Sequence, residues 1–187
     1  KGSFTATTYD GEDNLLSIDE PGPNGTRLVT SYSYDELDRP LTITRPDETV
    51  TISYQDGQQG NPLHSVTSTI TRPGHPSVTI VERYDALERL VAEEANSSTT
   101  EYEYDANSNV TGMFLTTPSM ARTRVQEFAY DVRGRLITIR DLRASRSVSL
   151  EYDRASQLIK QTYLPSGITK DITPGPRGEA KAIEYKK

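Results

Sequence analysis

The feature that most constrains the fold of this chain is a short motif that recurs along its length. The 187 residues include 11 tyrosines, and six of these are followed directly by aspartate. The six pairs are Tyr9 and Asp10, Tyr34 and Asp35, Tyr84 and Asp85, Tyr104 and Asp105, Tyr130 and Asp131, and Tyr152 and Asp153. Since an active site is ordinarily built once, six copies indicate a repeated structural unit.

The spacing of the copies predicts the length of the unit. Successive tyrosines of the motif lie 25, 50, 20, 26 and 22 residues apart. The interval of 50 contains "SYQDGQQG" at 53–60, which we interpret as a degenerate copy, and a second degenerate copy, "PGPRGEA", begins at Pro174. We therefore expect about eight units of 20 to 26 residues, forming one repeat segment over residues 1–187.

The residues between the motifs predict β-strands. Runs such as "TRLVTSYSY", "VTIVERY" and "RSVSLEY" are rich in β-branched and aromatic residues, and apolar and polar side chains alternate in them. No run has helical spacing with caps. Hydrophobic residues make up only 33% of the chain and Trp is absent, so a thick two-layer core would be hard to fill. The sequence predicts an all-β meander of antiparallel hairpins in a thin sheet.

The copy "YDVRGRL" at 130–136 explains what the motif does. Asp131 fits the first position of a type I turn, where its carboxylate accepts the backbone N–H two residues on, and Gly134 fits the left-handed position that closes a bulged hairpin. Tyr130 and Leu136 would then pack as a cross-strand pair, and Arg135 could lie along acids of a neighbouring hairpin. We expect the six turns at 10–13, 35–38, 85–88, 105–108, 131–134 and 153–156.

The other copies vary at the last position of the turn and at the position that follows it. The place of Gly134 is taken by Asp13, Asp38, Glu88, Ser108 and Ser156, and the place of Arg135 is taken by arginine again at Arg39 and Arg89. Glu88 should cost about 1 kcal/mol in a left-handed conformation, unless its turn takes another form.

Several functional classes are disfavoured by composition. The net charge of -6, with acids and bases intermixed, argues against a nucleic-acid partner. Without cysteine, disulfides and thiolate zinc sites are excluded. No apolar run approaches the length of a membrane-spanning helix. The opening "KGSF" indicates an excised fragment of a larger protein.

The carboxylates and histidines of the chain also allow catalytic and metal-binding interpretations. Paired carboxylates could serve a glycosidase, and a Ser-His-Asp site would need His64 or His75, but both histidines lie in proline-rich loops without a nucleophile-elbow pattern. "DGEDN" (10–14) and "DANSN" (105–109) have the alternating oxygens of calcium loops but lack the closing Glu. We expect no catalytic, cofactor-binding or metal-binding residues, and therefore no enzyme.

The motif, its spacing near 20 and the intervening "TRPDETV" resemble the Rhs or YD-repeat family over nearly the whole chain. In that family the repeats form one long curled sheet, a hollow shell that encloses a toxin polypeptide in bacterial Rhs toxins and in the B and C components of insecticidal toxin complexes. Animal teneurins carry a similar barrel outside the cell. The family's C-terminal signature is absent, so its autoproteolytic aspartates have no counterpart here.

The resemblance implies a non-catalytic arc of such a shell, secreted or extracellular, whose partners are other repeats and an enclosed guest polypeptide. Two alternatives remain open: an adhesion or carbohydrate-binding module of the teneurin kind, and a hydrolase around His64 and His75. Three sequons, at Asn24, Asn96 and Asn109, would carry glycans in a secreted eukaryotic protein. We also expect the isolated fragment to self-associate weakly through its unpaired edge strands.

Overall fold

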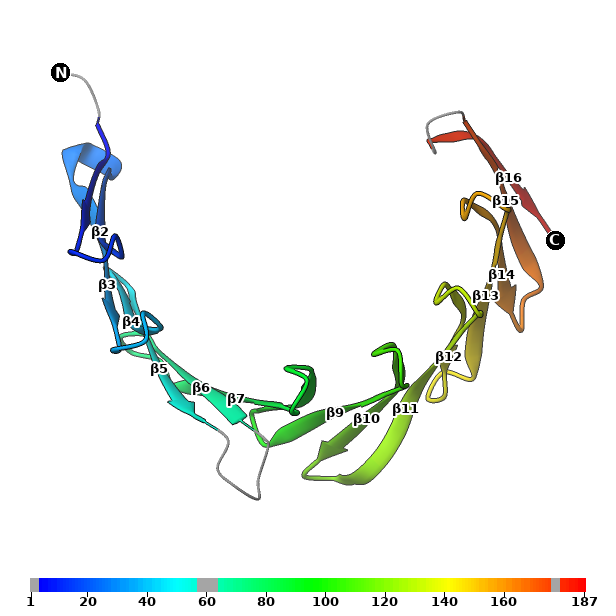
Figure 1. The fold of residues 1–187 in the computed structure, drawn as a ribbon, viewed down its shortest axis with the longest axis horizontal. Helices are drawn as coiled ribbons and strands as arrows, with labels where there is room; N and C mark the ends of the chain where they lie inside the picture. Colours follow the sequence, from blue (N-terminus) through cyan, green and yellow to red (C-terminus); the bar gives the residue numbers. More distant parts are fainter. Residues whose placement is uncertain (1–3, 57–63, 176–178) are drawn as a thin grey trace. The chain divides into compact units, whose positions relative to one another are not determined.

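The computed structural model describes residues 4–56, 64–175 and 179–187 (Figure 1). The chain divides into two compact units, residues 1–97 and 98–187. Each unit is a sheet of antiparallel strands, and in each the strand order follows the sequence. The prediction of an all-β fold made of antiparallel hairpins is confirmed. The described part of the chain contains no α-helix, and its one helical segment is the 3-10 turn Pro23–Gly25.

The strands of the first unit are β1 (Ala6–Tyr9), β2 (Leu15–Pro21), β3 (Arg27–Tyr34), β4 (Pro40–Arg45), β5 (Glu48–Gln55), β6 (His64–Thr71), β7 (Val78–Tyr84) and β8 (Leu90–Ala95). Those of the second unit are β9 (Ser98–Tyr104), β10 (Val110–Thr117), β11 (Met120–Tyr130), β12 (Leu136–Asp141), β13 (Arg146–Tyr152), β14 (Leu158–Leu164), β15 (Ile168–Pro174) and β16 (Ala180–Lys186). Among the residues described, no helix is long and apolar enough to cross a membrane.

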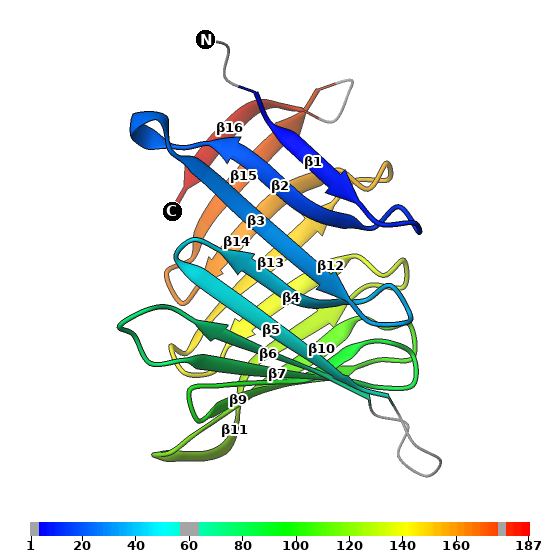
Figure 2. The same ribbon diagram turned by 90° about the vertical axis from the view of Figure 1, so that its left-hand side faces the viewer.

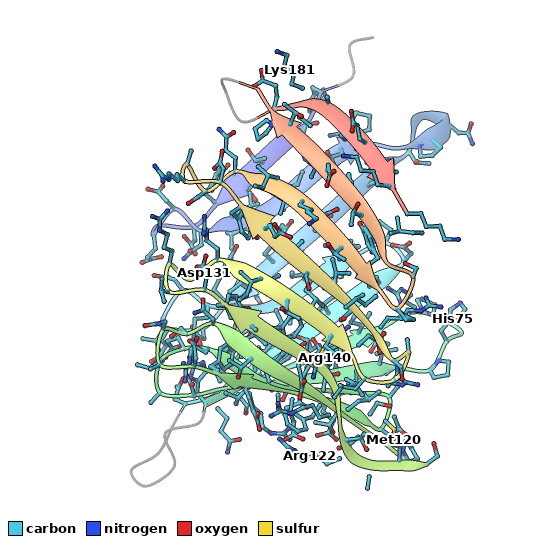
Figure 3. All side chains as sticks on the ribbon, turned by 90° about the vertical axis from the view of Figure 1, so that its right-hand side faces the viewer. His75, Met120, Arg122, Asp131, Arg140 and Lys181 are labelled. Atoms are coloured by element: carbon cyan, nitrogen blue, oxygen red, sulfur yellow. The ribbon has the colours of Figure 1, made fainter. Side chains whose placement is uncertain are left out.

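Two kinds of turn connect the strands, the Tyr-Asp turns and all the others. They lie along opposite edges of each sheet, meaning the two edges formed by the ends of the strands. In the first unit, the Tyr-Asp turns between β1 and β2, β3 and β4, and β7 and β8 share one edge, and the turns after β2, β4 and β6 lie at the other (Figure 2). In the second unit, Asp131 marks the Tyr-Asp edge, and Met120 lies at the opposite end of β11 (Figure 3). This arrangement brings the motifs of each unit into one row.

Alternation of side chains gives each sheet an apolar face and a polar face, as predicted. In the first unit, an apolar row crosses five paired strands through Tyr32, Ile43, Val50, Ile70 and Val78. One residue along each strand, a hydroxyl row crosses the other face through Ser33, Thr42, Thr51, Thr69 and Thr79. The second unit repeats the pattern, with an apolar row through Phe128, Ile139, Val148, Tyr163 and Ile168 and a hydroxyl row through Thr138, Ser149, Thr162 and Thr169.

Neither sheet is covered by a second layer of secondary structure, and the consequence is a very small core. Among the residues described, the only buried hydrophobic side chains are Phe114 and Val125. Most other apolar side chains on the strands are half-buried. Because area burial per residue is low, backbone ladders, turn hydrogen bonds and contacts between repeats must supply much of the stability.

Candidate functional site: the Tyr-Asp turn and its link to the next repeat

The six Tyr-Asp motifs form hairpins of one design. We number the motif positions 1 to 7, so that Tyr130 occupies position 1, Asp131 position 2, Gly134 position 5, Arg135 position 6 and Leu136 position 7. In every copy position 1 pairs with position 7, and the register shifts by one residue just inside the hairpin. The predicted cross-strand pair of Tyr130 and Leu136 is therefore confirmed.

The aspartate at position 2 holds the turn together, as predicted. Asp131 Oδ1 accepts hydrogen bonds from the backbone N–H groups of Arg133 (2.9 Å) and Arg135 (3.0 Å). The backbone N–H of Asp131 in turn donates to the carbonyl of Arg135 at 2.9 Å. The same N–H to carbonyl bond, from position 2 to position 6, closes all six motifs, so these side chains act on the local backbone.

Position 5 is left-handed in all six copies. Gly134 has φ 74°, and the non-glycine residues at this position have φ between 59° and 65°. They are Asp13, Asp38, Glu88, Ser108 and Ser156. The alternative that the turn at Glu88 takes another form is therefore wrong: Glu88 has φ 60°, and its N–H donates to the Asp85 carbonyl at 3.0 Å, as that of Gly134 does to Asp131.

Position 6 supplies a donor to the second oxygen of the aspartate. Arg135 Nε donates to Asp131 Oδ2 at 2.7 Å, and Arg39 and Arg89 do the same to Asp35 and Asp85 at 2.8 Å. Where position 6 is asparagine, its amide takes this role, as Asn109 Nδ2 does with Asp105 Oδ2 at 2.9 Å. The expectation that Arg135 would lie along acids of a neighbouring hairpin is thus corrected. The carboxylate that Arg135 binds is that of Asp131 in its own turn, because positions 2 and 6 lie next to each other across the turn.

These contacts lower the pKa of four turn aspartates, Asp10, Asp35, Asp85 and Asp131. The guanidinium of Arg135 is the main cause of the lowered pKa of Asp131, and Arg89 has the same effect on the pKa of Asp85. For Asp10 and Asp35, partial burial would raise the pKa, but the hydrogen bonds that their carboxylates accept outweigh it and the pKa falls. These four turns are therefore held by charged carboxylates.

Within each unit, neighbouring hairpins are also tied together at several junctions. Tyr152 Oη donates to the carbonyl of Leu136, position 7 of the preceding motif, at 2.8 Å. Tyr34 and Tyr130 make the same bond to Leu15 and Val110, both at 2.9 Å. Sequence reasoning missed this link, although a signal was present: all six copies have tyrosine, and phenylalanine would fill the same apolar space without the hydroxyl.

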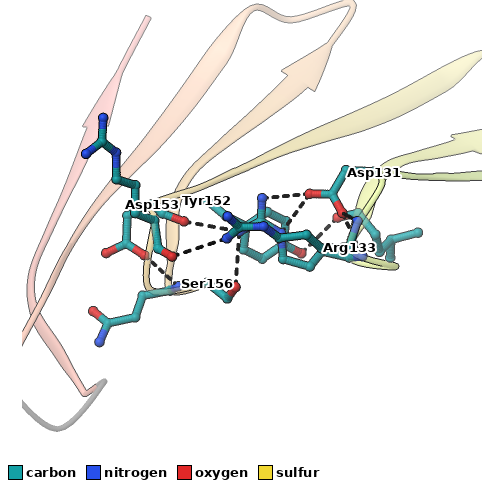
Figure 4. Close-up of polar contacts among 9 residues, drawn as sticks. Asp131, Arg133, Tyr152, Asp153 and Ser156 are labelled. Atoms are coloured by element: carbon teal, nitrogen blue, oxygen red, sulfur yellow. Dashed lines mark hydrogen bonds and ion pairs between the residues drawn. The ribbon is translucent and has the colours of Figure 1, made fainter.

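A second contact runs in the opposite direction between neighbouring motifs. The guanidinium of Arg135 lies over the ring of Tyr152, with Cζ 4.8 Å from the ring centroid. Its Nη1 donates to the Asp153 carbonyl at 3.1 Å and to Ser156 Oγ at 3.3 Å (Figure 4). One arginine therefore holds its own turn, the ring of the next tyrosine and the next turn.

The two degenerate copies keep part of this design. Tyr54 Oη donates to the Pro40 carbonyl at 2.9 Å, and Arg39 lies over the Tyr54 ring, so Tyr54 occupies position 1 of its copy. The rest of that copy, from residue 57, lies outside the described residues. In the last copy, Pro174 pairs with Ala180, and Gly175 N–H donates to the Glu179 carbonyl at 2.6 Å. The hairpin register thus survives without tyrosine or aspartate.

The residues considered for catalysis and metal binding are placed in the same framework. The His64 ring stacks on Tyr84, with 4.9 Å between centroids, and His64 Nε2 lies 3.2 Å from Glu88 Oε2. His75 lies in the turn between β6 and β7. Asp10 Oδ1 accepts the N–H groups of Glu12 and Asn14. Over the described residues, no three His, Cys, Asp or Glu side chains are grouped to hold a metal ion.

A charged cluster on the polar face of the second unit was not predicted. Phe114 is buried beneath Arg122 and Arg124, whose Cζ atoms lie 3.7 and 4.8 Å from its ring centroid. Arg122 pairs with Glu101, and Arg124 pairs with Glu103 and with Glu127. The sequence pattern had no signal for this burial, because Phe114 faces the polar side of its strand.

Comparisons with known proteins agree with the repeat. Residues 9–50 match the family model described as RHS Repeat. No curated protein sequence matches the chain. A crystal structure of TcdB2-TccC3 matches with a TM-score of 0.74 and 13% identity, covering 98% of this chain and 11% of that one. One of TcdB2-TccC3-Cdc42 matches with a TM-score of 0.72 and 14% identity, covering 98% and 10%. The chain thus shares their fold and spans about a tenth of their length.

Proposed function

We propose that this chain, which belongs to the Rhs or YD-repeat family, forms part of the wall of a protein shell that encloses a toxin polypeptide. The observation that carries the proposal is the link between successive motifs. At four junctions within the two units a Tyr-Asp hairpin or its degenerate copy is held to the preceding one through the tyrosine hydroxyl, and in the Arg39 and Arg135 copies through the arginine as well. Such a design can extend a single-layer sheet that has only a small core.

The same proposal covers the remaining properties of the chain. Both units belong to one repeat segment of a longer protein, and the segment is structural and non-catalytic. Its partners are the other repeats of the wall and the enclosed guest polypeptide, and the shell acts outside the cell that makes it. The fold shared with the TcdB2-TccC3 structures supports this assignment, as does the match of residues 9–50 to the RHS repeat model.

The test is electron cryo-microscopy and limited proteolysis of the full-length protein that contains these residues. We expect this segment in the wall of a closed cavity, and we expect the guest to be cut only after the wall is opened. Tyr130→Phe combined with Tyr152→Phe removes two links, and should speed cleavage of the guest. Tyr185→Phe, a change on the exposed strand β16, is the matched control. A guest cut equally fast in all three proteins would contradict the proposal.

The second candidate is an extracellular adhesion or carbohydrate-binding module, which the exposure of two sequons favours. Asn24 and Asn96 are exposed in turns, each with positive φ. Asn109 is half-buried, and its amide nitrogen donates to Asp105, so a glycan there would cost a turn hydrogen bond. Mass spectrometry of protein secreted from eukaryotic cells is the test: glycans on Asn24 and Asn96 but not on Asn109 would favour this candidate.

A further inference from the structure

The junction between the first two Tyr-Asp motifs differs from the two junctions in which arginine covers the next tyrosine. The junction between the Tyr104 and Tyr130 motifs also has asparagine at position 6, Asn109, but position 5 of its next motif is Gly134, which has no carboxylate. Where position 6 is arginine, its guanidinium fills the space beside the next motif's tyrosine. Arg39 Cζ lies 4.3 Å from the centroid of the Tyr54 ring, and its Nη1 donates to Asp56 Oδ1 at 2.8 Å. Arg135 fills the equivalent space over Tyr152. These junctions show that the space fits a guanidinium.

At the first junction the residue at position 6 is Asn14, whose side chain is too short to reach over the next ring. Asn14 Nδ2 donates to Asp10 Oδ2 at 3.2 Å and to Asp38 Oδ1 at 2.8 Å. The Tyr34 ring is nevertheless held as in the other junctions, because its hydroxyl bonds to the Leu15 carbonyl. A hollow of about 470 Å³ lies here, with Asp10, Asn14, Tyr34 and Asp38 among the residues that line it.

The hollow is more negatively charged than the junctions whose space is filled by Arg39 or Arg135. Five carboxylates line it, those of Asp10, Glu12, Asp35, Glu36 and Asp38, and no lysine or arginine is among the described lining residues. Asp35 has a counter-ion in Arg39. Asp38 stands where the Arg135 junction has Ser156, so a carboxylate replaces a hydroxyl at the point where a guanidinium would donate. The junction therefore lacks a cation and carries an additional acceptor for one.

We propose that this hollow binds an arginine side chain of another polypeptide. The guanidinium would lie over the Tyr34 ring and donate to Asp38, as Arg135 lies over Tyr152 and donates to Ser156 within this chain. Arginine suits the site better than lysine, since a planar guanidinium both stacks on an aromatic ring and donates to two acceptors at once. The inference comes from comparison of the repeats and does not depend on the shell.

The test is an NMR titration of the 187-residue protein with the blocked tripeptide Gly-Arg-Gly, and with the same peptide carrying citrulline. Citrulline keeps the shape of arginine and removes the charge. We expect saturable shifts of the amides of Asp10, Asn14, Tyr34 and Asp38 with the arginine peptide, and at least about tenfold weaker binding of the citrulline peptide. Equal effects of the two peptides, or shifts spread over the whole surface, would overturn the proposal.

Two variants separate the hollow from general attraction of cations to an acidic protein. Asn14→Arg supplies an internal guanidinium, so it should abolish the localised shifts and should raise the unfolding midpoint in urea. Asp47→Asn removes an exposed carboxylate in the turn between β4 and β5, and should leave binding unchanged. Binding that persists in Asn14→Arg with a folded spectrum would also overturn the proposal. The higher urea midpoint of Asn14→Arg would show, independently of the titration, that a guanidinium fits the hollow.

Discussion

At the scale of single residues, the residue at position 5 sets the conformational strain of each turn, because this position is left-handed in all six copies. Only Gly134 adopts this conformation without a steric penalty, whereas the Asp, Glu and Ser residues of the other copies adopt it with one. The five strained copies persist because the aspartate carboxylate and the backbone bonds of the turn over-determine the local geometry. Substitutions at position 5 therefore test the turn directly.

Gly134→Val should lower the free energy of unfolding by about 1 to 3 kcal/mol, because a β-branched residue resists positive φ. A steric clash is not the cause, since a Cβ at Gly134 meets nothing within 4 Å. Gly11→Val is the control: Gly11 also has open space around its Cβ position, and its φ is not in the left-handed region. Urea denaturation measures both, and equal midpoints for Gly134→Val and the unmodified protein would show that the turn assignment is wrong.

Glu88→Gly should stabilise the protein by roughly 0.5 to 1 kcal/mol. Relief of the left-handed strain exceeds the entropy that glycine adds to the unfolded chain. Leu87→Gly in the same turn is the control, because Leu87 has no positive φ to relieve and glycine there should destabilise. Thermal or urea unfolding of the two variants gives opposite signs if the argument holds. A loss of stability in both would contradict it.

Stability should fall in acid through the turn aspartates. The pKa of Asp131 is lower in the folded protein than the ordinary value near 3.9, chiefly because Arg135 donates to it. Its contribution is therefore complete above that ordinary value, and is lost as the pH falls through the folded pKa. The urea midpoint should drop between about pH 5 and pH 2. In Asp131→Asn the drop should be smaller, and an unchanged pH profile in that variant would exclude Asp131 as a source.

At the scale of strands and hairpins, the links between motifs couple neighbouring hairpins within each unit. These links join residues that are 14 to 20 positions apart in the sequence. A link through a tyrosine hydroxyl contributes one hydrogen bond to a half-buried carbonyl, and a guanidinium over the same ring adds a cation–π contact. The hairpins are thus expected to unfold together.

Tyr152→Phe should lower the free energy of unfolding by about 0.5 to 1.5 kcal/mol, since it removes the hydrogen bond to the Leu136 carbonyl and keeps the ring under Arg135. Tyr185→Phe should change it by less than about 0.5 kcal/mol, because Tyr185 is exposed on β16. Urea denaturation of the two variants is the comparison. A loss of the same size in both would mean that the hydroxyl of Tyr152 holds nothing.

At the scale of the whole molecule, single-layer sheets leave much apolar surface uncovered. Exposed large side chains include Leu28, Val29, Leu164, Ile183 and Tyr185. Strands β1 and β16 are each paired on one side only, and all residues of β16 are exposed. Uncovered apolar patches and open backbone groups at strand edges both favour contact with other chains.

We therefore expect the 187-residue chain, expressed by itself, to form weak dimers or small oligomers. The net charge of -6 and the lysines Lys181, Lys186 and Lys187 oppose extended edge pairing, so fibres are not expected. Sedimentation velocity over a wide concentration range measures the association, and Ile183→Lys, a charge on the apolar face of β16, should weaken it. A strictly monomeric protein at high concentration would contradict this expectation.

Features that arise from contacts within a few residues could be predicted from the amino-acid sequence. An aspartate that caps its own turn, a left-handed position three residues later and alternation along a strand all act within a few residues, so Asp131, Gly134 and the two faces of each strand were readable directly. The repeat also indicated the antiparallel hairpins, because a seven-residue motif that begins with Tyr-Asp stood between strand-like runs each time. It likewise placed the degenerate copy at Pro174, whose register the structure confirms.

Contacts between neighbouring repeats could be seen only in the tertiary structure, because they depend on how the repeats align. Motif spacing varies from 20 to 26 residues, so nothing in the sequence shows that the Tyr152 hydroxyl reaches Leu136 or that Arg135 covers the Tyr152 ring. The same holds for Phe114, which lies on the polar face and is buried only because arginines from β11 fold over it. Local preference disfavours a left-handed conformation for Glu88. The turn forms nevertheless, because the hydrogen bonds around Asp85 outweigh the strain at this one residue.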